Sequence, residues 1–114
     1  NHIIAAGSIA NAVTLARKQS SAASVEVEVE SLVEYQEASE AKPDRIMLDN
    51  FSLDDMRSAV ALNYNGIELE ASGNITLENI RTIAETGIDY ISIGALTKNI
   101  KAIDLSMRIN LVTD

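Results

Sequence analysis

Three carboxylates stand at equal spacing in this chain and could serve one site. Glu28, Asp49 and Glu70 are separated by 21 residues each. Each falls in or at the end of a short apolar stretch of the kind that predicts a β-strand. In parallel α/β folds, sites are built at the carboxyl ends of the strands. The spacing therefore predicts that the three side chains lie at one level and point into one space.

Carboxylates gathered in one place need a cationic partner, because burying unpaired charges is costly. The partner could be a metal ion, a group of Lys and Arg side chains, or a cationic substrate. Hard carboxylate oxygens suit Mg²⁺, which commonly takes one or two protein ligands together with substrate phosphates. The alternative is that each acid only caps the following helix or forms a surface ion pair.

Two loops of small residues follow consecutive predicted strands. They have the sequences ASGN, with Ser72, Gly73 and Asn74, and GALT, with Gly94 and Ala95. Small residues let backbone N–H groups approach an anion, and a following helix adds a partial positive charge. Lys98 follows the second loop and could reach the same anion, although a solvated lysine is an equally good interpretation. We predict a phosphate site there, against the alternative of two ordinary turns.

His2 is the only histidine of the chain. It lies at the start of the sequence, where we expect the end of a strand. A single histidine forms no catalytic dyad, so we expect a supporting or structural role for it.

The elements that must position these residues alternate between strand and helix. We expect helices over 8–20, 31–41, 52–62, 76–85 and 102–109, and strands over 25–30, 45–49, 67–70 and 89–93. Ser8, Ser52 and Thr76 are the expected N-caps. Alternating strands and helices predict a parallel sheet within an α/β fold, of which a (β/α) barrel is one form.

The stretch VEVEVE is unusual for a strand of such a sheet, because three valines alternate with three glutamates. Side chains alternate between the two faces of a strand. We expect the valines to face the outer helices and Glu26, Glu28 and Glu30 to face the barrel interior. Glu26 and Glu30 would then be supporting charges.

Composition excludes several classes of protein. The 114 residues carry a net charge of −8 and no cysteine. The acidic balance argues against nucleic-acid binding, which normally needs a basic patch. No apolar run is long enough to span a membrane, and the absence of cysteine is compatible with the cytoplasm.

Five segments together resemble one enzyme family. VEVEVE, IMLDNF, LEASGNIT, TGIDYISIGALTK and AIDLSMRI occur in the order found in the C-terminal half of quinolinate phosphoribosyltransferase, also called nicotinate-nucleotide pyrophosphorylase. Asn1 and His2 resemble the end of that family's Lys-x-Asn-His motif. The resemblance covers essentially the whole chain, so we expect residues 1–114 to be the C-terminal part of the α/β-barrel domain, roughly half of the family's incomplete TIM-like barrel.

The resemblance implies an activity. The family joins quinolinate to phosphoribosyl pyrophosphate, with Mg²⁺, and releases nicotinate mononucleotide, pyrophosphate and carbon dioxide in the synthesis of NAD. It implies that Glu28 and Asp49 are catalytic and face the ribose and the Mg²⁺-bound pyrophosphate, directly or through water. Glu70 would support them. The family works as a dimer, and we expect a homodimer or a larger homo-oligomer in the cytoplasm.

The resemblance also assigns the phosphate site. It implies that Ser72, Gly73, Asn74, Gly94 and Ala95 surround the substrate phosphate, with Lys98 nearby. Many members have Gly where Asn74 stands and His where Lys98 stands, and both changes keep a donor or a cation available.

The cationic residues with which the family binds the quinolinate carboxylates have no counterpart in this chain. We therefore expect the isolated chain to be inactive. Two other interpretations stay open. The first is a different enzyme, either another phosphate-binding barrel or a related phosphoribosyltransferase fold with another substrate. The second is a half-barrel that is not catalytic.

Overall fold

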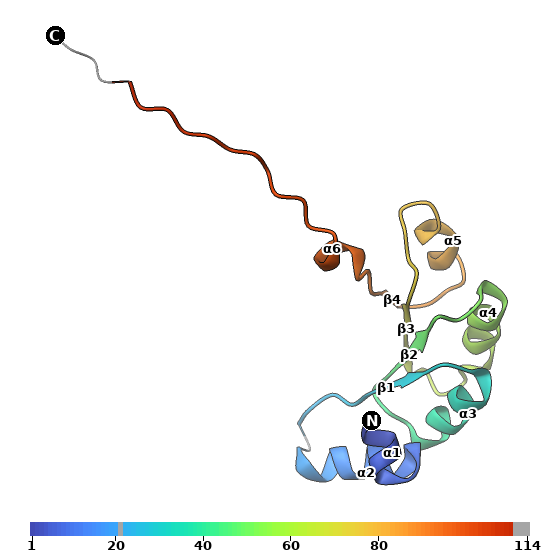
Figure 1. The fold of residues 1–114 in the computed structure, drawn as a ribbon. Coiled ribbons are helices and arrows are strands. Elements are labelled where there is room, and N and C mark those ends of the chain that lie inside the picture. Colours follow the sequence, from blue (N-terminus) through green and yellow to red (C-terminus); the bar gives the residue numbers. More distant parts are fainter. Residues whose placement is uncertain (21, 111–114) are drawn as a thin grey trace.

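The computed structural model describes residues 1–20 and 22–110. Its elements, in chain order, are α1 (His2–Ala6), α2 (Ile9–Gln19), β1 (Glu26–Val29), α3 (Leu32–Ala41), β2 (Arg45–Asp49), α4 (Leu53–Leu62), β3 (Glu68–Ser72), α5 (Ile80–Ala84), β4 (Tyr90–Ile91) and α6 (Ala95–Lys98). Figure 1 shows the strands side by side, with α3, α4 and α5 on one side of them.

The four strands form one parallel sheet in the order β1-β2-β3-β4. Each strand is joined to the next by a helix that returns the chain to the start of the sheet. This arrangement confirms the predicted α/β class and the alternating order of elements. It places all the βα loops at one edge, the carboxyl edge of the sheet.

Serine side chains fix the starts of three helices. The hydroxyls of Ser8, Ser31 and Ser52 accept hydrogen bonds from backbone N–H groups three residues further along. The Ser52 hydroxyl also donates to the Asp55 carboxylate at 2.7 Å, in place of the backbone N–H that would donate in a capping box. The N-caps expected at Ser8 and Ser52 are confirmed.

The core lies between the sheet and its helices. The strand residues that point to the helices are apolar and buried: Val27, Val29, Ile46, Leu48, Leu69 and Ala71. Tyr35 and Ala38 of α3 and Met56 and Ala59 of α4 pack on them from the helix side. The valines of VEVEVE therefore face the helices, as predicted, and the glutamates of that strand lie on the open face of the sheet.

The predicted common level of the three acids is wrong. Glu28 and Glu70 are both aligned with Met47 of the strand between them, whereas Asp49 is aligned with Ser72. Asp49 thus lies two residues nearer the carboxyl edge than the other two acids. Equal spacing in the sequence does not give equal height, because the loops and helices between successive strands differ in length.

Three other local predictions are wrong. His2 lies in the short helix α1 and not at the end of a strand. The helix predicted over 76–85 is shorter in the structure, since α5 begins at Ile80 with Asn79, and not Thr76, as its N-cap residue. Residues 102–109 are extended, where we expected a helix.

Beyond α6 the chain leaves the sheet as a long extended segment (Figure 1). We call residues 99–110 the C-terminal arm. Its large apolar side chains are 76–85% exposed: Ile100, Ile103, Leu105, Met107 and Ile109. Within the described residues, no helix has the length and apolar character needed to cross a bilayer.

Candidate active site at the carboxyl edge of the sheet

Three carboxylates meet on the open face where β1 and β2 end. Each of Glu28, Glu30 and Asp49 offers an oxygen that lies within 4.8 Å of an oxygen of the other two. We call these residues the acidic cluster. Glu28 and Glu30 are exposed and Asp49 is half-buried. Such a set of hard oxygens fits a divalent cation, since Mg²⁺ and Mn²⁺ prefer carboxylate ligands.

The structure brings together the two acids that the sequence singled out, Glu28 and Asp49. It adds Glu30, for which we expected only a supporting role. The signal for Glu30 was present in the sequence, because VEVEVE already places it on the same face as Glu28.

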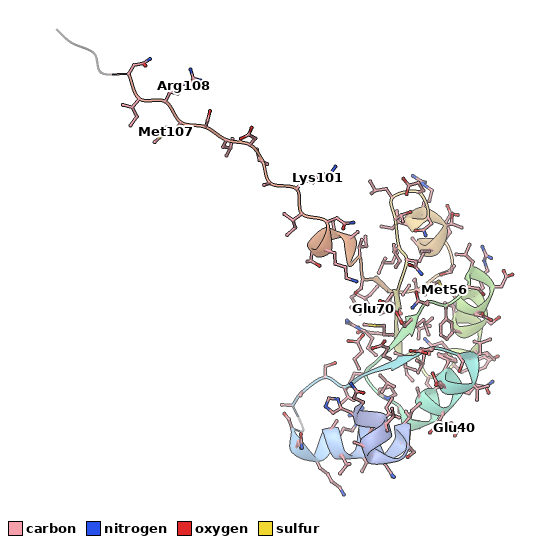
Figure 2. The ribbon with its side chains drawn as sticks, in the orientation of Figure 1. Glu40, Met56, Glu70, Lys101, Met107 and Arg108 are labelled. Atoms are coloured by element: carbon pink, nitrogen blue, oxygen red, sulfur yellow. The ribbon has the colours of Figure 1, made fainter. Side chains whose placement is uncertain are left out.

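Glu70 belongs to a different group of side chains. It is buried, with 6% of its surface exposed. Arg45 donates to its carboxylate at 3.1 Å, and the Ser92 hydroxyl donates a short hydrogen bond to its other oxygen. Figure 2 shows Glu70 among the strands. Its charge is therefore paired with a cation inside the protein, whereas the described residues form no ion pair with the acidic cluster.

Arg45 organises this second group. Its guanidinium also binds Glu68 at 2.8 Å and lies 3.8 Å from the centre of the Tyr90 ring. The Tyr90 hydroxyl in turn donates to Glu68 at 3.2 Å. We call Arg45, Glu68, Glu70, Tyr90 and Ser92 the Arg45 network. The hydrogen bonds from Arg45 lower the pKa of Glu68.

Glu26 lies beside this network and has the opposite electrostatic environment. Partial burial raises its pKa, and the negative charge of Glu70 raises it further. Arg45 opposes both effects but does not cancel them. The open face therefore has two parts: a part that contains its own cation, and the acidic cluster, which does not.

The first predicted phosphate loop is only partly a loop, because Ser72 is the last residue of β3. The turn that follows it has an unusual backbone conformation. Gly73 has φ of 90° and Asn74 has φ of 51°. Asn50, at the end of the neighbouring strand, also has a positive φ, of 55°. Its backbone N–H donates to the Ser72 carbonyl at 2.9 Å, so the loops after β2 and β3 are joined at the carboxyl edge.

The second loop lies next to the first, since the Ser92 N–H donates to the Ala71 carbonyl at 2.9 Å. Gly94 and Ala95 begin the single turn of α6. The Lys98 side chain folds back towards Gly94, where a Cβ would lie 3.9 Å from its Cε atom. The structure thus brings both small-residue loops and Lys98 to one edge of the sheet.

His2 and Glu28 both line a groove of about 560 Å³ that runs between α1, α2 and the outer edge of β1. Most of the other lining residues are apolar. The His2 side chain is exposed.

Asn50 is the residue that sequence reasoning missed. It stands inside the IMLDNF segment, directly after Asp49. Its amide donates to the Asp49 carboxylate at 2.8 Å and accepts from the Asn74 amide at 3.0 Å. Its position after a strand-end acid was a signal, but only the structure shows the contact with the next loop.

The parallel sheet is covered by helices on one face and bears carboxylates and small-residue loops at its carboxyl edge. This arrangement is that of part of an α/β barrel, the fold in which enzymes carry their active sites at this edge. Residues 1–108 match the family described as "Quinolinate phosphoribosyl transferase, C-terminal domain". The chain belongs to this family.

Known relatives agree with the match. The chain is 42% identical over 112 residues to the probable nicotinate-nucleotide pyrophosphorylase [carboxylating] of Bacillus subtilis, and 46% identical over 113 residues to that of Synechocystis. The structure of the nicotinate-nucleotide pyrophosphorylase from Francisella tularensis superimposes with a TM-score of 0.86 and 55% identity over 93% of this chain. The superposition confirms the predicted partial barrel.

The relatives are much longer than this chain. The match to the Bacillus protein includes 97% of this chain but only 39% of the relative's length. This chain likewise covers 38% of the length of the Synechocystis and Francisella proteins.

Proposed function

We propose that this chain is the carboxylate-bearing part of an enzyme that converts quinolinate and phosphoribosyl pyrophosphate into nicotinate mononucleotide, pyrophosphate and carbon dioxide. We call the longer protein the parent enzyme. The observation that carries the proposal is the meeting of Glu28 and Asp49 in the acidic cluster of a chain that belongs to this family.

In this reaction the bond between the ribose C1 atom and the pyrophosphate oxygen breaks, and its electron pair leaves with pyrophosphate. Positive charge develops on the ribose. Glu28 and Asp49 would stabilise that charge electrostatically, because fixed carboxylates that need no rearrangement favour the cationic transition state. The quinolinate ring nitrogen then forms the bond to C1.

Carbon dioxide leaves from the carboxylate next to the ring nitrogen. The electrons of the broken carbon–carbon bond stay on the ring carbon, next to the positively charged nitrogen, and that carbon takes up a proton. This step needs a well-positioned ring more than an acid or base of the protein. A role of His2 as a proton donor is not required.

The acidic cluster fits Mg²⁺, and Glu28, Glu30 and Asp49 would hold it. Bound there, Mg²⁺ would supply positive charge that neutralises the leaving pyrophosphate. The proposed binding site for the substrate phosphate consists of Ser72, Gly73, Asn74, Gly94 and Ala95, with Lys98 as a nearby cation. Its support is that both loops lie at the edge where the acidic cluster lies.

The parent enzyme is proposed to be a homodimer or a larger homo-oligomer. The support is the exposed apolar surface of the C-terminal arm, which a second chain or the rest of the parent would cover. A location in the cytoplasm stays a prediction; relatives from Arabidopsis thaliana and rice are named as chloroplastic.

The test is product formation by the parent enzyme with Glu28→Gln and Asp49→Asn. We expect each variant to lower kcat by about 100-fold or more, the usual effect of removing one group that stabilises transition-state charge. Glu40→Gln is the matched control, since Glu40 is exposed on the outer side of α3 (Figure 2). Absence of nicotinate mononucleotide from the unmodified enzyme would favour another phosphate-binding barrel enzyme instead.

A further inference from the structure

Asn50 connects two parts of the site that lie on different strands. Its side-chain nitrogen donates to the Asp49 carboxylate at 2.8 Å, and its side-chain oxygen accepts from the Asn74 nitrogen at 3.0 Å. The orientation of the Asn50 amide is fixed by chemistry. Turned over, its oxygen would face the Asp49 carboxylate, and the contact between these two acceptors would be repulsive.

The Asn50 side chain packs directly against Gly73. A Cβ at Gly73 would lie 2.9 Å from the Asn50 backbone nitrogen and would overlap the Asn50 amide. The φ of 90° at Gly73 disfavours a side chain as well. The glycine therefore leaves the space in which the Asn50 amide reaches the loop after β3.

The connection continues into that loop. Asn74 is held at its carbonyl by the Asn79 amide at 3.0 Å, and the Asn79 oxygen accepts from the Thr76 N–H at 2.8 Å. A displacement of Asp49 can thus reach the start of α5 through hydrogen bonds between side chains and loop backbone. Asn50 and Asn74 both have a positive φ, which asparagine adopts more readily than most residues.

We propose that Asn50 is a positioning residue that couples the acidic cluster to the loop of residues 72–74. It acts through Asp49 on one side and through Asn74 on the other. Binding of a divalent cation at the acidic cluster fixes Asp49, and Asn50 transmits this order to the loop, so that a phosphate binds there more tightly. The inference rests on the proposed function, which places the cation and the phosphate at these two sites.

The test measures this coupling by titration calorimetry on the parent enzyme with Mn²⁺ alone, ribose 5-phosphate alone, and each in the presence of the other. Coupling is reciprocal, so each ligand must raise the affinity of the other by the same factor. Asn50→Gly removes the amide and keeps the positive φ without strain. We expect it to weaken Mn²⁺ binding by about 10-fold, as loss of a partner behind a metal ligand does, and to reduce the coupling factor at least threefold.

Asn74→Gly is the second variant, and it removes only the hydrogen bond between the Asn74 and Asn50 side chains. We expect it to reduce the coupling factor while Mn²⁺ affinity stays within about twofold of the unmodified value. It also decides the question if Asn50→Gly fails to fold. Asn65→Gly is the matched control, because Asn65 lies in a turn at the opposite end of β3; it should change neither affinity nor coupling.

An unchanged coupling factor in Asn50→Gly and Asn74→Gly overturns the inference. So does an unmodified enzyme that forms product but shows no coupling, and that result leaves the proposed function standing. An enzyme that binds neither ligand and forms no product overturns both.

Discussion

Arg45 makes the difference between the two groups of carboxylates on the open face. It neutralises Glu68 and Glu70 through hydrogen bonds of 2.8 Å and 3.1 Å and stacks on Tyr90. Arg–carboxylate pairs of this kind are among the stronger polar contacts in proteins. Glu26 lies next to them but gains too little from Arg45 to offset its burial and the charge of Glu70.

The raised pKa of Glu26 predicts how stability depends on pH. A carboxyl group whose pKa is higher in the folded state than in the unfolded state binds its proton more tightly when folded. Its contribution is present below the ordinary pKa of 4.5 and is lost as the pH rises through the raised value. Glu26→Gln removes this loss, because glutamine does not ionise.

We therefore expect Glu26→Gln to gain stability relative to the unmodified protein over the pH range that begins at about 4.5 and rises through the raised pKa of Glu26. Urea unfolding at several pH values in this range measures the effect. Glu40→Gln, on the exposed side of α3, should run parallel to the unmodified protein. Identical pH profiles for Glu26→Gln and the unmodified protein would contradict the electrostatic account of Glu26.

Among the elements, α3 contains an unpaired polar group in the core. Tyr35 is 1% exposed, and within the described part of the chain its hydroxyl has no hydrogen-bond partner. Burial raises the pKa of this hydroxyl. An unpaired buried hydroxyl costs stability, whereas the ring packs well against the sheet.

Tyr35→Phe should therefore keep the packing and remove the cost. We expect the free energy of unfolding to stay unchanged or to rise by up to about 1 kcal/mol, measured by urea denaturation at neutral pH. A loss of more than about 1 kcal/mol would mean that the hydroxyl has a hydrogen-bond partner after all.

Element patterns were readable from the sequence where one rule dominated. The alternation in VEVEVE gave the correct faces of β1, and serine N-caps gave correct helix starts. Residues 102–109 were assigned wrongly to a helix although Ile103, Leu105, Met107 and Ile109 alternate with other residues, which is the period of an extended chain.

The site was readable only in part. Strand-end acids predicted Glu28 and Asp49 together, and the structure confirms that they meet. The register between strands could not be read from spacing, because loop and helix lengths vary. The partners of Glu70 and the contacts of Asn50 come from neighbouring strands, so no local pattern contains them.

At the scale of the whole molecule, the chain is far more extended than a compact domain of its length. Its radius of gyration is 20.5 Å, against about 13 Å for a compact chain of this size. The C-terminal arm accounts for the long dimension of 77 Å (Figure 1). β1 and β4 lie at the edges of the described sheet, and unpaired strand edges invite pairing with another chain.

The isolated 114 residues should therefore form no measurable nicotinate mononucleotide under conditions in which the parent enzyme is active. The acidic cluster could hold a cation, but the resemblance implies that the quinolinate carboxylates are bound by cationic residues without a counterpart in this chain. A coupled assay for pyrophosphate release measures this, and turnover by the isolated chain would refute the expectation.

Protease cleavage of the exposed C-terminal arm can also show whether another surface covers the arm. An extended backbone fits a protease active site, and the arm presents Lys101 and Arg108 as trypsin sites. Brief trypsin treatment of the isolated chain should remove the arm first and leave the sheet intact. In the parent enzyme, resistance of the bonds after Lys101 and Arg108 to trypsin would show that another surface covers the C-terminal arm. The rate of slow cleavage would then measure how often the arm dissociates from that surface.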